Sequence, residues 1–289
     1  ASTGNAGAAL AGMAAAVGQK AIVLAPKTAP PAKVAQLLVF GATVLLVDGT
    51  YDDAFDLTLK ASQEFGWYCR NTGYNPFTAE GKKTAALEIW EWWRTTHAEW
   101  HHAIGEAAEH APLTIFVSVG DGNIISGIHK GFKDLVQLGW LSAVPRLIGV
   151  QAAGSAAIAN AFRDGTEVIT PVSAKTLADS ISVDLPRDGV RAVRAARETG
   201  GAYVVVSDDE ILGAVADLGI AGVFAEPAGA AAYAGLLKAR KEGVVNTGDP
   251  ILVLNTGSGL KDVNAAMRAV GAAPVIEPTL KALKGALHK

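Results

Sequence analysis

Apolar runs alternate with helix-like spacing along the first seventy residues. Residues 21–25 and 43–47 are apolar runs, which predict strands buried on both faces, as in a parallel sheet. Residues 28–40 and 51–65 have the spacing of amphipathic helices, and each stretch stops at a glycine. We expect a third strand to begin at residues 67–69.

The same alternation resumes after a break. Residues 71–83 are rich in asparagine, glycine and proline, and we place a crossing between two lobes here. We therefore expect a smaller α/β lobe over residues 1–80 and a larger α/β lobe over residues 81–289. Further apolar runs predict strands over residues 113–119, 146–150, 203–206 and 250–254. Strands and helices that alternate with short connections are typical of a doubly wound α/β fold.

Composition narrows the class of protein. The 289-residue chain is half apolar and has a net charge of −3, so its charge gives no reason to expect nucleic acid or an anionic membrane as a partner. No apolar run approaches the roughly 20 residues that span a bilayer. The single cysteine, Cys69, excludes an internal disulfide, suits a cytoplasmic protein, and has no zinc-ligand spacing with the histidines.

A long helical region follows Lys83 and carries four tryptophans, at positions 90, 92, 93 and 100. Tryptophans bunched on a helix are more typical of a core or a subunit interface than of a ligand site. We therefore expect a homodimer.

The opening stretch, Ala1 to Gly7, leads small hydroxyl and glycine residues directly into an alanine-rich helix pattern. The first turn of a helix has unpaired amides and a partial positive charge, so this stretch is suited to bind an anion. An ordinary capped surface helix is the alternative. The stretch has no strand before it and no initiator methionine, and we expect an upstream segment.

Two other glycine-rich loops follow predicted strands, at residues 120–127 and 255–259. Loops at the carboxyl ends of parallel strands are where ligands bind in such folds. The first loop departs from the dinucleotide fingerprint, and the next strand ends in Gln151 rather than in an acidic residue, which disfavours NAD. A cradle for one phosphate fits better, with a simple tight turn as the alternative. Thr256 is either a turn residue or points into a ligand.

Several stretches taken together resemble the fold type II pyridoxal-phosphate enzymes, and their order is most similar to threonine synthase. They are Ala1-Ser2-Thr3-Gly4-Asn5, residues 119–124, Ala178-Asp179-Ser180-Ile181-Ser182-Val183, Glu226-Pro227-Ala228 and Thr256-Gly257-Ser258-Gly259-Leu260-Lys261-Asp262. The resemblance covers nearly the whole chain. It implies two doubly wound three-layer α/β lobes with the cofactor cleft between them, and with the first part of the large lobe missing from this sequence.

The resemblance also implies site residues for pyridoxal 5'-phosphate and an amino-acid substrate. The cofactor-binding residues are Asn5 at the phenolic oxygen, the amides of Gly120, Asp121, Gly122, Asn123 and Ile124 at the phosphate, and Thr256 at the pyridine nitrogen. The substrate-binding residues are Ser2, Thr3 and Gly4 at the carboxylate, Asn75 in the segment that surrounds the substrate phosphate, and Glu226 at the edge of the site. No metal is implied. The lysine that carries the cofactor is expected upstream of Ala1, so no catalytic residue is assigned within this chain.

The implied reaction converts O-phosphohomoserine and water to threonine and phosphate. Four positions depart from the substrate-phosphate pattern of the family, namely Ala6, Thr72, Gly73 and Thr78. An arginine is usual at the place of Thr78, and threonine cannot replace the bidentate hydrogen bonds that an arginine donates to phosphate. A serine/threonine dehydratase or a β-replacement enzyme is therefore the alternative, and a cofactor-binding protein without catalysis is a weaker one.

Overall fold

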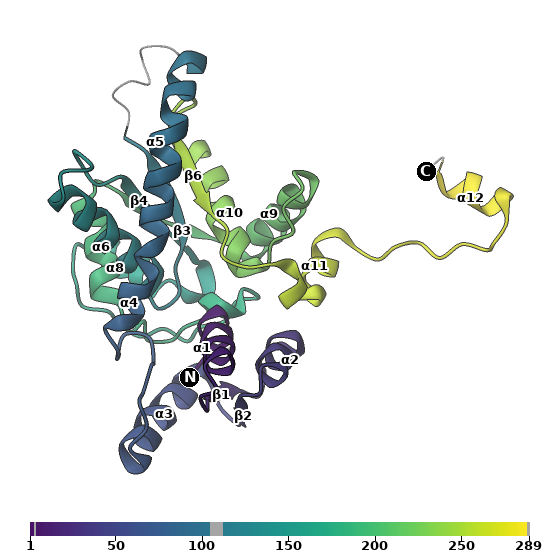
Figure 1. The fold of residues 1–289 in the computed structure, drawn as a ribbon. Coiled ribbons are helices and arrows are strands. Elements are labelled where there is room, and N and C mark those ends of the chain that lie inside the picture. Colours follow the sequence, from purple (N-terminus) through teal and green to yellow (C-terminus); the bar gives the residue numbers. More distant parts are fainter. Residues whose placement is uncertain (3, 105–111, 288–289) are drawn as a thin grey trace.

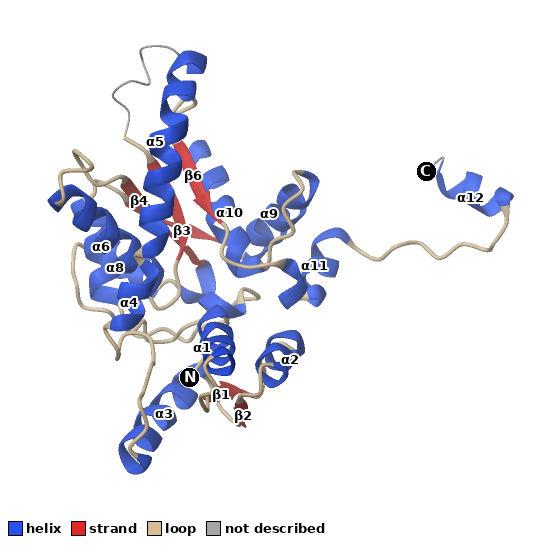
Figure 2. Cartoon of the chain, in the orientation of Figure 1, coloured by secondary structure: helices blue, strands red, loops and turns tan. Residues whose placement is uncertain are grey.

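A computed structural model describes residues 1–2, 4–104 and 112–287, and the chain folds around two separate parallel sheets (Figure 2). A two-stranded sheet pairs β1 (Ile22–Pro26) with β2 (Thr43–Val47). A four-stranded sheet has the order β5-β4-β3-β6, with every neighbouring pair parallel. The α/β fold class predicted from the alternation is confirmed.

The small sheet is surrounded by helices α1 (Asn5–Ala16), α2 (Pro31–Val39) and α3 (Tyr51–Phe65) (Figure 1). Helix α3 begins at a capping box, in which Thr50 and Asp53 exchange hydrogen bonds, and it stops at Gly66 in the left-handed conformation with φ of 67°. We name β1, β2 and these three helices the small unit.

The predicted strand at residues 67–69 is wrong. These residues form a loop, in which Trp67 is 39% exposed and Tyr68 is 76% exposed. Aromatic residues have a high strand propensity, but a strand forms only where a partner strand is available, and here no described strand lies beside them.

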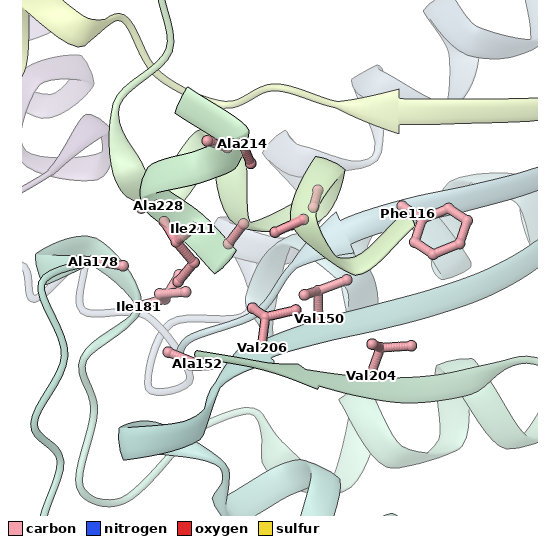
Figure 3. Packing of buried hydrophobic residues seen from close by; sticks show 14 of the residues in the cluster. Phe116, Val150, Ala152, Ala178, Ile181, Val204, Val206, Ile211, Ala214 and Ala228 are labelled. Atoms are coloured by element: carbon pink, nitrogen blue, oxygen red, sulfur yellow. The ribbon is translucent and has the colours of Figure 1, made fainter. Parts of the chain in front are cut away.

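The four strands of the large sheet are β3 (Thr114–Ser118), β4 (Arg146–Ala152), β5 (Ala202–Val206) and β6 (Ile251–Leu254). Side chains alternate between its two faces. Ile115 and Val117 pack in one apolar cluster with α6 and α8, and Phe116 packs in another with α9 and α10. Figure 3 shows the second cluster, with Val150, Val204 and Val206 on the same face as Phe116. We name this sheet and the elements packed on it the large unit.

The helices of the large unit lie on both faces of its sheet (Figure 1). They are α4 (Phe77–Lys82), α5 (Thr84–Ile104), α6 (Asn123–Gln137), α7 (Ala157–Arg163), α8 (Gly189–Glu198), α9 (Asp208–Ile220), α10 (Pro227–Lys241) and α11 (Val263–Val270), with short 3₁₀ turns at Ala153–Ser155, Asp179–Ile181 and Gly259–Lys261. The last helix, α12 (Leu280–Leu287), has no buried residue and lies away from the rest of the chain. In the part of the chain that the structure describes, no helix is both long and apolar enough to cross a bilayer.

Helix α4 packs closely against α6. A Cβ atom at Gly127 would lie 2.7 Å from the Cβ of Lys82, and one at Gly131 would lie 2.7 Å from that of Ala86. Gly127 therefore lets α4 approach α6, and Gly131 does the same for the start of α5 (Thr84–Ile104). The lobe boundary expected between residues 80 and 81 falls inside α4 and stays a prediction.

The order of the strands determines where a ligand can bind. The chain leaves β3 for β4 and β5 on one side and later returns to β6 on the other side of β3. The loops that follow β3 and β6 therefore diverge and leave a crevice at the carboxyl ends of the strands. Both loops are ones that the sequence marked as glycine-rich.

The central strand provides a test of the core. Phe116 has no exposed surface, so Phe116→Ala should lower the free energy of unfolding by about 3–5 kcal/mol through lost contacts and a cavity. Urea unfolding of the complete protein measures the change. Leu287→Ala is the control, because Leu287 is 75% exposed and its truncation should change stability by less than about 0.5 kcal/mol. Equal effects of the two substitutions would contradict this description of the core.

Candidate functional site

One pocket of about 460 Å³ lies where the loops of the two units meet, a volume within the usual range for small-molecule sites. It collects most of the residues singled out from the sequence. Those that line it are Ser2, Gly4, Asn5, Gly120, Asp121, Gly122, Asn123, Ile124, Glu226 and Thr256. Thr3 lies outside the described residues. The three separate loops of the sequence therefore share one hollow.

Asn75 does not line this pocket. Its side-chain amide donates to the carbonyl of Cys69 at 2.9 Å, and its Oδ1 accepts from the amide of Phe77 at 3.0 Å. It lies instead beside Trp67 and Tyr68 in a second, shallow hollow. The predicted contact between Asn75 and a substrate has no support in this position.

The loop after β3 is suited to an anion. Gly122 has a φ of +90°, and a Cβ atom there would lie 2.7 Å from that of Ala192, so only glycine fits without strain. Among the described residues, the backbone amides of residues 120–125 donate to no acceptor. These amides stand at the start of the 15-residue helix α6, whose dipole adds positive charge. Such free amides form a cradle that fits a phosphate group.

The first loop is held differently from what the sequence suggested. The amide of Ser2 donates to the carbonyl of Leu24 at 3.1 Å, and the Ser2 hydroxyl accepts from the amides of Gly4 at 3.3 Å and Gly7 at 2.9 Å. The amides of Ser2 and Gly4 are thus already engaged. Within the described residues, those of Asn5 and Ala6 are free and line the pocket.

The side chain of Asn5 joins the two units. Its Nδ2 donates to the carbonyl of Thr256, and its Oδ1 accepts from Nζ of Lys261. Asn5 and Thr256, which are 251 positions apart in the sequence, therefore meet at one edge of the pocket. The part played by Lys261 was missed, because nothing in its local spacing points to a partner so distant.

A buried lysine of the small unit pairs with Glu226 of the large unit at the edge of the pocket. Lys33 is 4% exposed, and its Nζ lies 3.2 Å from a carboxylate oxygen of Glu226 and 3.1 Å from one of Asp179. It also donates to the hydroxyl of Ser180 at 2.8 Å. The sequence reasoning missed Lys33, although its place one turn before the buried Leu37 on α2 was a signal.

Asp121 connects the glycine loop to the small unit. It accepts from the hydroxyl of Tyr51 at 2.9 Å and from the amide of Arg187 at 3.2 Å, and the Arg187 guanidinium lies 2.8 Å from Asp52. Burial raises the pKa of Asp121 to about 6, against the two hydrogen bonds, which favour the charged form. Burial also raises the pKa of Tyr51 well above its usual range, with the charge of Asp121 contributing in the same direction.

Residues 1–257 match the model of one protein family, described as pyridoxal-phosphate dependent enzymes. The chain belongs to this family. Its cofactor is pyridoxal phosphate, and the free amides of the glycine loop fit the phosphate of that group. The resemblance drawn from the sequence motifs is thereby confirmed at the level of the family.

The relatives within the family to which the chain is similar include threonine synthases. The chain is 37% identical to the threonine synthase of Methanocaldococcus jannaschii over 292 residues, which cover the whole of this chain and 68% of that protein. It is 35% identical to the threonine synthase of Mycobacterium tuberculosis over 271 residues, covering 93% of this chain and 69% of that protein.

Solved structures share the fold at lower identity. Diaminopropionate ammonia lyase from Escherichia coli matches with a TM-score of 0.74 and 20% identity, over 93% of this chain and 68% of that one. The processed form of threonine deaminase isoform 2 from Solanum lycopersicum matches with a TM-score of 0.71 and 22% identity, over 94% and 72%. At this identity, these matches establish the fold alone.

The Lys33 cluster gives the first test of the site. Lys33→Met should lower the free energy of unfolding by about 3–5 kcal/mol, because it leaves the buried Glu226 without its cation. The double variant Lys33→Met with Glu226→Gln should recover part of this loss, since it removes the uncompensated charge as well. Urea unfolding of the cofactor-free protein measures both. If the double variant loses as much stability as Lys33→Met and Glu226→Gln do in sum, the two side chains are not coupled.

Asp121 predicts a pH dependence of stability. A carboxyl whose pKa is raised in the folded state binds its proton more tightly there than in the unfolded chain, so its contribution to stability is lost as the pH rises from about 4 to about 6. Asp121→Asn removes this loss. As the pH rises from about 4.5 to about 7.5, the free energy of unfolding of the variant should increase by about 1–3 kcal/mol relative to that of the wild type. Urea unfolding of both proteins at the two pH values measures this change. If the difference in unfolding free energy between variant and wild type is the same at both pH values, the raised pKa is refuted.

Proposed function

We propose that the protein is a pyridoxal-phosphate-dependent lyase of the threonine synthase type, which converts O-phosphohomoserine and water to threonine and phosphate. The observation that carries the proposal is the similarity to threonine synthases along the whole chain, at 34–37% identity. The pocket supports it, because it lies between the two units and combines an anion cradle with free amides at a second helix start.

The proposed arrangement assigns each loop a part of the cofactor or substrate. The amides of residues 120–124 hold the phosphate, the side chain of Asn5 faces the phenolic oxygen, and the hydroxyl of Thr256 faces the pyridine nitrogen. The substrate carboxylate takes the free amides at the start of α1. Lys33 orients Glu226 at the edge of the pocket through their 3.2 Å contact. The small unit and the large unit then correspond to the two lobes around the cofactor.

The chemistry divides between the cofactor and the chain. When bound, pyridoxal phosphate stabilises negative charge at the substrate carbon next to the amino group. The residues of this chain position that carbon and set the charge around it. Thr256 is a neutral partner, which leaves the pyridine nitrogen unprotonated and suits elimination and replacement at the β and γ carbons. The homodimer also belongs to this proposal.

The test is an assay of the complete protein loaded with pyridoxal phosphate. We expect equimolar release of phosphate and threonine from O-phosphohomoserine, measured by a phosphate assay and by amino-acid analysis. Cofactor binding without either product would contradict the substrate assignment. Phosphate release with a ketoacid in place of threonine would contradict the final addition of water.

One observation favours a second function. Ala6 and Thr72, which stand where substrate-phosphate ligands are expected, both line the pocket and carry no charge. A serine/threonine dehydratase needs no such ligands. Ketoacid formation from serine or threonine, with no product from O-phosphohomoserine, would favour that function over the first.

A further inference from the structure

The ammonium group of Lys33 is fully occupied by three groups of the large unit. It donates to the hydroxyl of Ser180 at 2.8 Å and to a carboxylate oxygen of Asp179 at 3.1 Å, and it lies 3.2 Å from a carboxylate oxygen of Glu226. An ammonium has three N–H donors, so none is left for a ligand. The three partners line the pocket, whereas Lys33 does not. Lys33 can therefore act on a ligand through the groups that it holds.

The two carboxylates that Lys33 contacts differ in burial. The side chains of Lys33 and Glu226 are each 4% exposed, and that of Asp179 is 27% exposed. Solvent screens the charge of Asp179 more than that of a buried group, because the effective dielectric constant is higher near the surface. The negative charge that acts most strongly within the pocket from this cluster is therefore that of Glu226, and Lys33 is the cation that balances it.

The carboxylate of Glu226 lies against the turn that carries Thr256. Its Oε1 packs on Gly257, where a Cβ atom would overlap with it. The backbone fixes this contact, because the amide of Glu226 donates to the carbonyl of Gly257 at 3.0 Å and Ala225 forms an antiparallel bridge with Ser258. Thr256 directly precedes Gly257 and lines the same pocket. An anionic group is thus held beside the turn at Thr256.

The carboxylate has a consequence for the arrangement proposed above, in which Thr256 faces the pyridine nitrogen of the cofactor. A nearby carboxylate favours the protonated form of a nitrogen base, and the balancing charge of Lys33 opposes that preference. Lys261 is a further cation at this turn, where it bonds to Asn5, but it is more exposed than Lys33 and its charge is screened more strongly. Asp262, the next residue, is engaged as the cap of α11.

We propose that Lys33 is a positioning residue that acts through Glu226: it neutralises this carboxylate and thereby keeps the pyridine nitrogen that faces Thr256 unprotonated. The neutral hydroxyl and the buried ion pair then act in the same direction, and together they limit how much charge the bound ring withdraws from the substrate. The inference rests on the proposed function for the place of the pyridine nitrogen, and it is independent of which amino acid is the substrate.

The experiment uses the complete protein, without substrate, loaded with pyridoxal phosphate that carries ¹⁵N in its ring. The ¹⁵N NMR shift of the bound cofactor reports whether the ring nitrogen carries a proton, and it is followed as a function of pH. Lys33→Met leaves Glu226 without its cation, the double variant Lys33→Met with Glu226→Gln removes both charges, and Lys33→Arg keeps the cation. Asp179→Asn is the matched control, because it removes a carboxylate from the same ammonium and leaves the Glu226 pair in place.

We expect the ring nitrogen of the wild type to be unprotonated near neutral pH. Lys33→Met should move the midpoint of its protonation upward by about one to three pH units, as expected for an uncompensated opposite charge nearby. Lys33→Arg, Asp179→Asn and the double variant should keep the wild-type midpoint. Recovery in the double variant, which has no ion pair, separates an effect of charge from a purely structural effect of losing the contact.

The proposal is overturned if Lys33→Met leaves the midpoint unchanged, if the double variant is shifted as far as Lys33→Met, or if Asp179→Asn has the same effect. Thermal unfolding and cofactor titration verify that each variant folds and is loaded. Lys33→Gln, which can still donate a hydrogen bond to Glu226, repeats the test with a smaller loss of stability.

A further variant tests the premise by itself. Thr256→Asp places an acidic group at the turn and should protonate the nitrogen in the presence of Lys33. If it has no effect, the place of the nitrogen is wrong and the proposal falls with it. Because no arm contains substrate, a failed assay for threonine formation leaves the test of Lys33 intact.

Discussion

The structure depends on a polar contact between two units that have separate cores. Among the residues that the structure describes, each of the three apolar clusters belongs to one sheet, and none of them joins the small unit to the large unit. The units meet instead through Lys33 with Glu226, Asn5 with Thr256, and Tyr51 with Asp121. Of these, the Lys33–Glu226 pair is buried on both sides. A buried ion pair adds little net stability but tolerates few alternative arrangements, so it sets the geometry at this edge of the pocket.

The glycine loop after β3 brings groups of both charges to the pocket. The glycine loop contributes free amides and a carboxyl at Asp121 with a raised pKa. Through Asn123 it also contacts Lys82, a half-buried lysine that has no acidic partner among the described residues. The carboxyl bonds away from the amides, toward Tyr51 and the backbone of Arg187. Its carboxylate is thereby engaged at the contact between the two units, although Asp121 also lines the pocket.

The structure also changes how the departures from the family pattern are understood. Thr78, where the resemblance implies an arginine, is buried and contacts Asn123 through its hydroxyl. Lys82 lies four residues later on the same helix and contacts the same asparagine. Positions four apart share one face of a helix, so Thr78 and Lys82 contact Asn123 from the same side of α4. A lysine therefore lies one helical turn from the position where the resemblance implies an arginine.

The sequence by itself determined the elements and the chemistry of the loops, because both follow from local pattern. Apolar runs and glycine stops marked all six strands that the structure describes and the helix over residues 51–65, and glycine-rich strand ends marked two sides of the pocket. The same local reasoning produced the false strand at residues 67–69, since pairing needs a neighbour that spacing cannot supply. Only the tertiary structure decided that Asn75 lies outside the pocket and that Lys33, Lys82 and Lys261 belong to its surroundings. Their partners lie about 40 to 260 positions away, and long-range burial and charge pairing arise from how the two sheets are brought together.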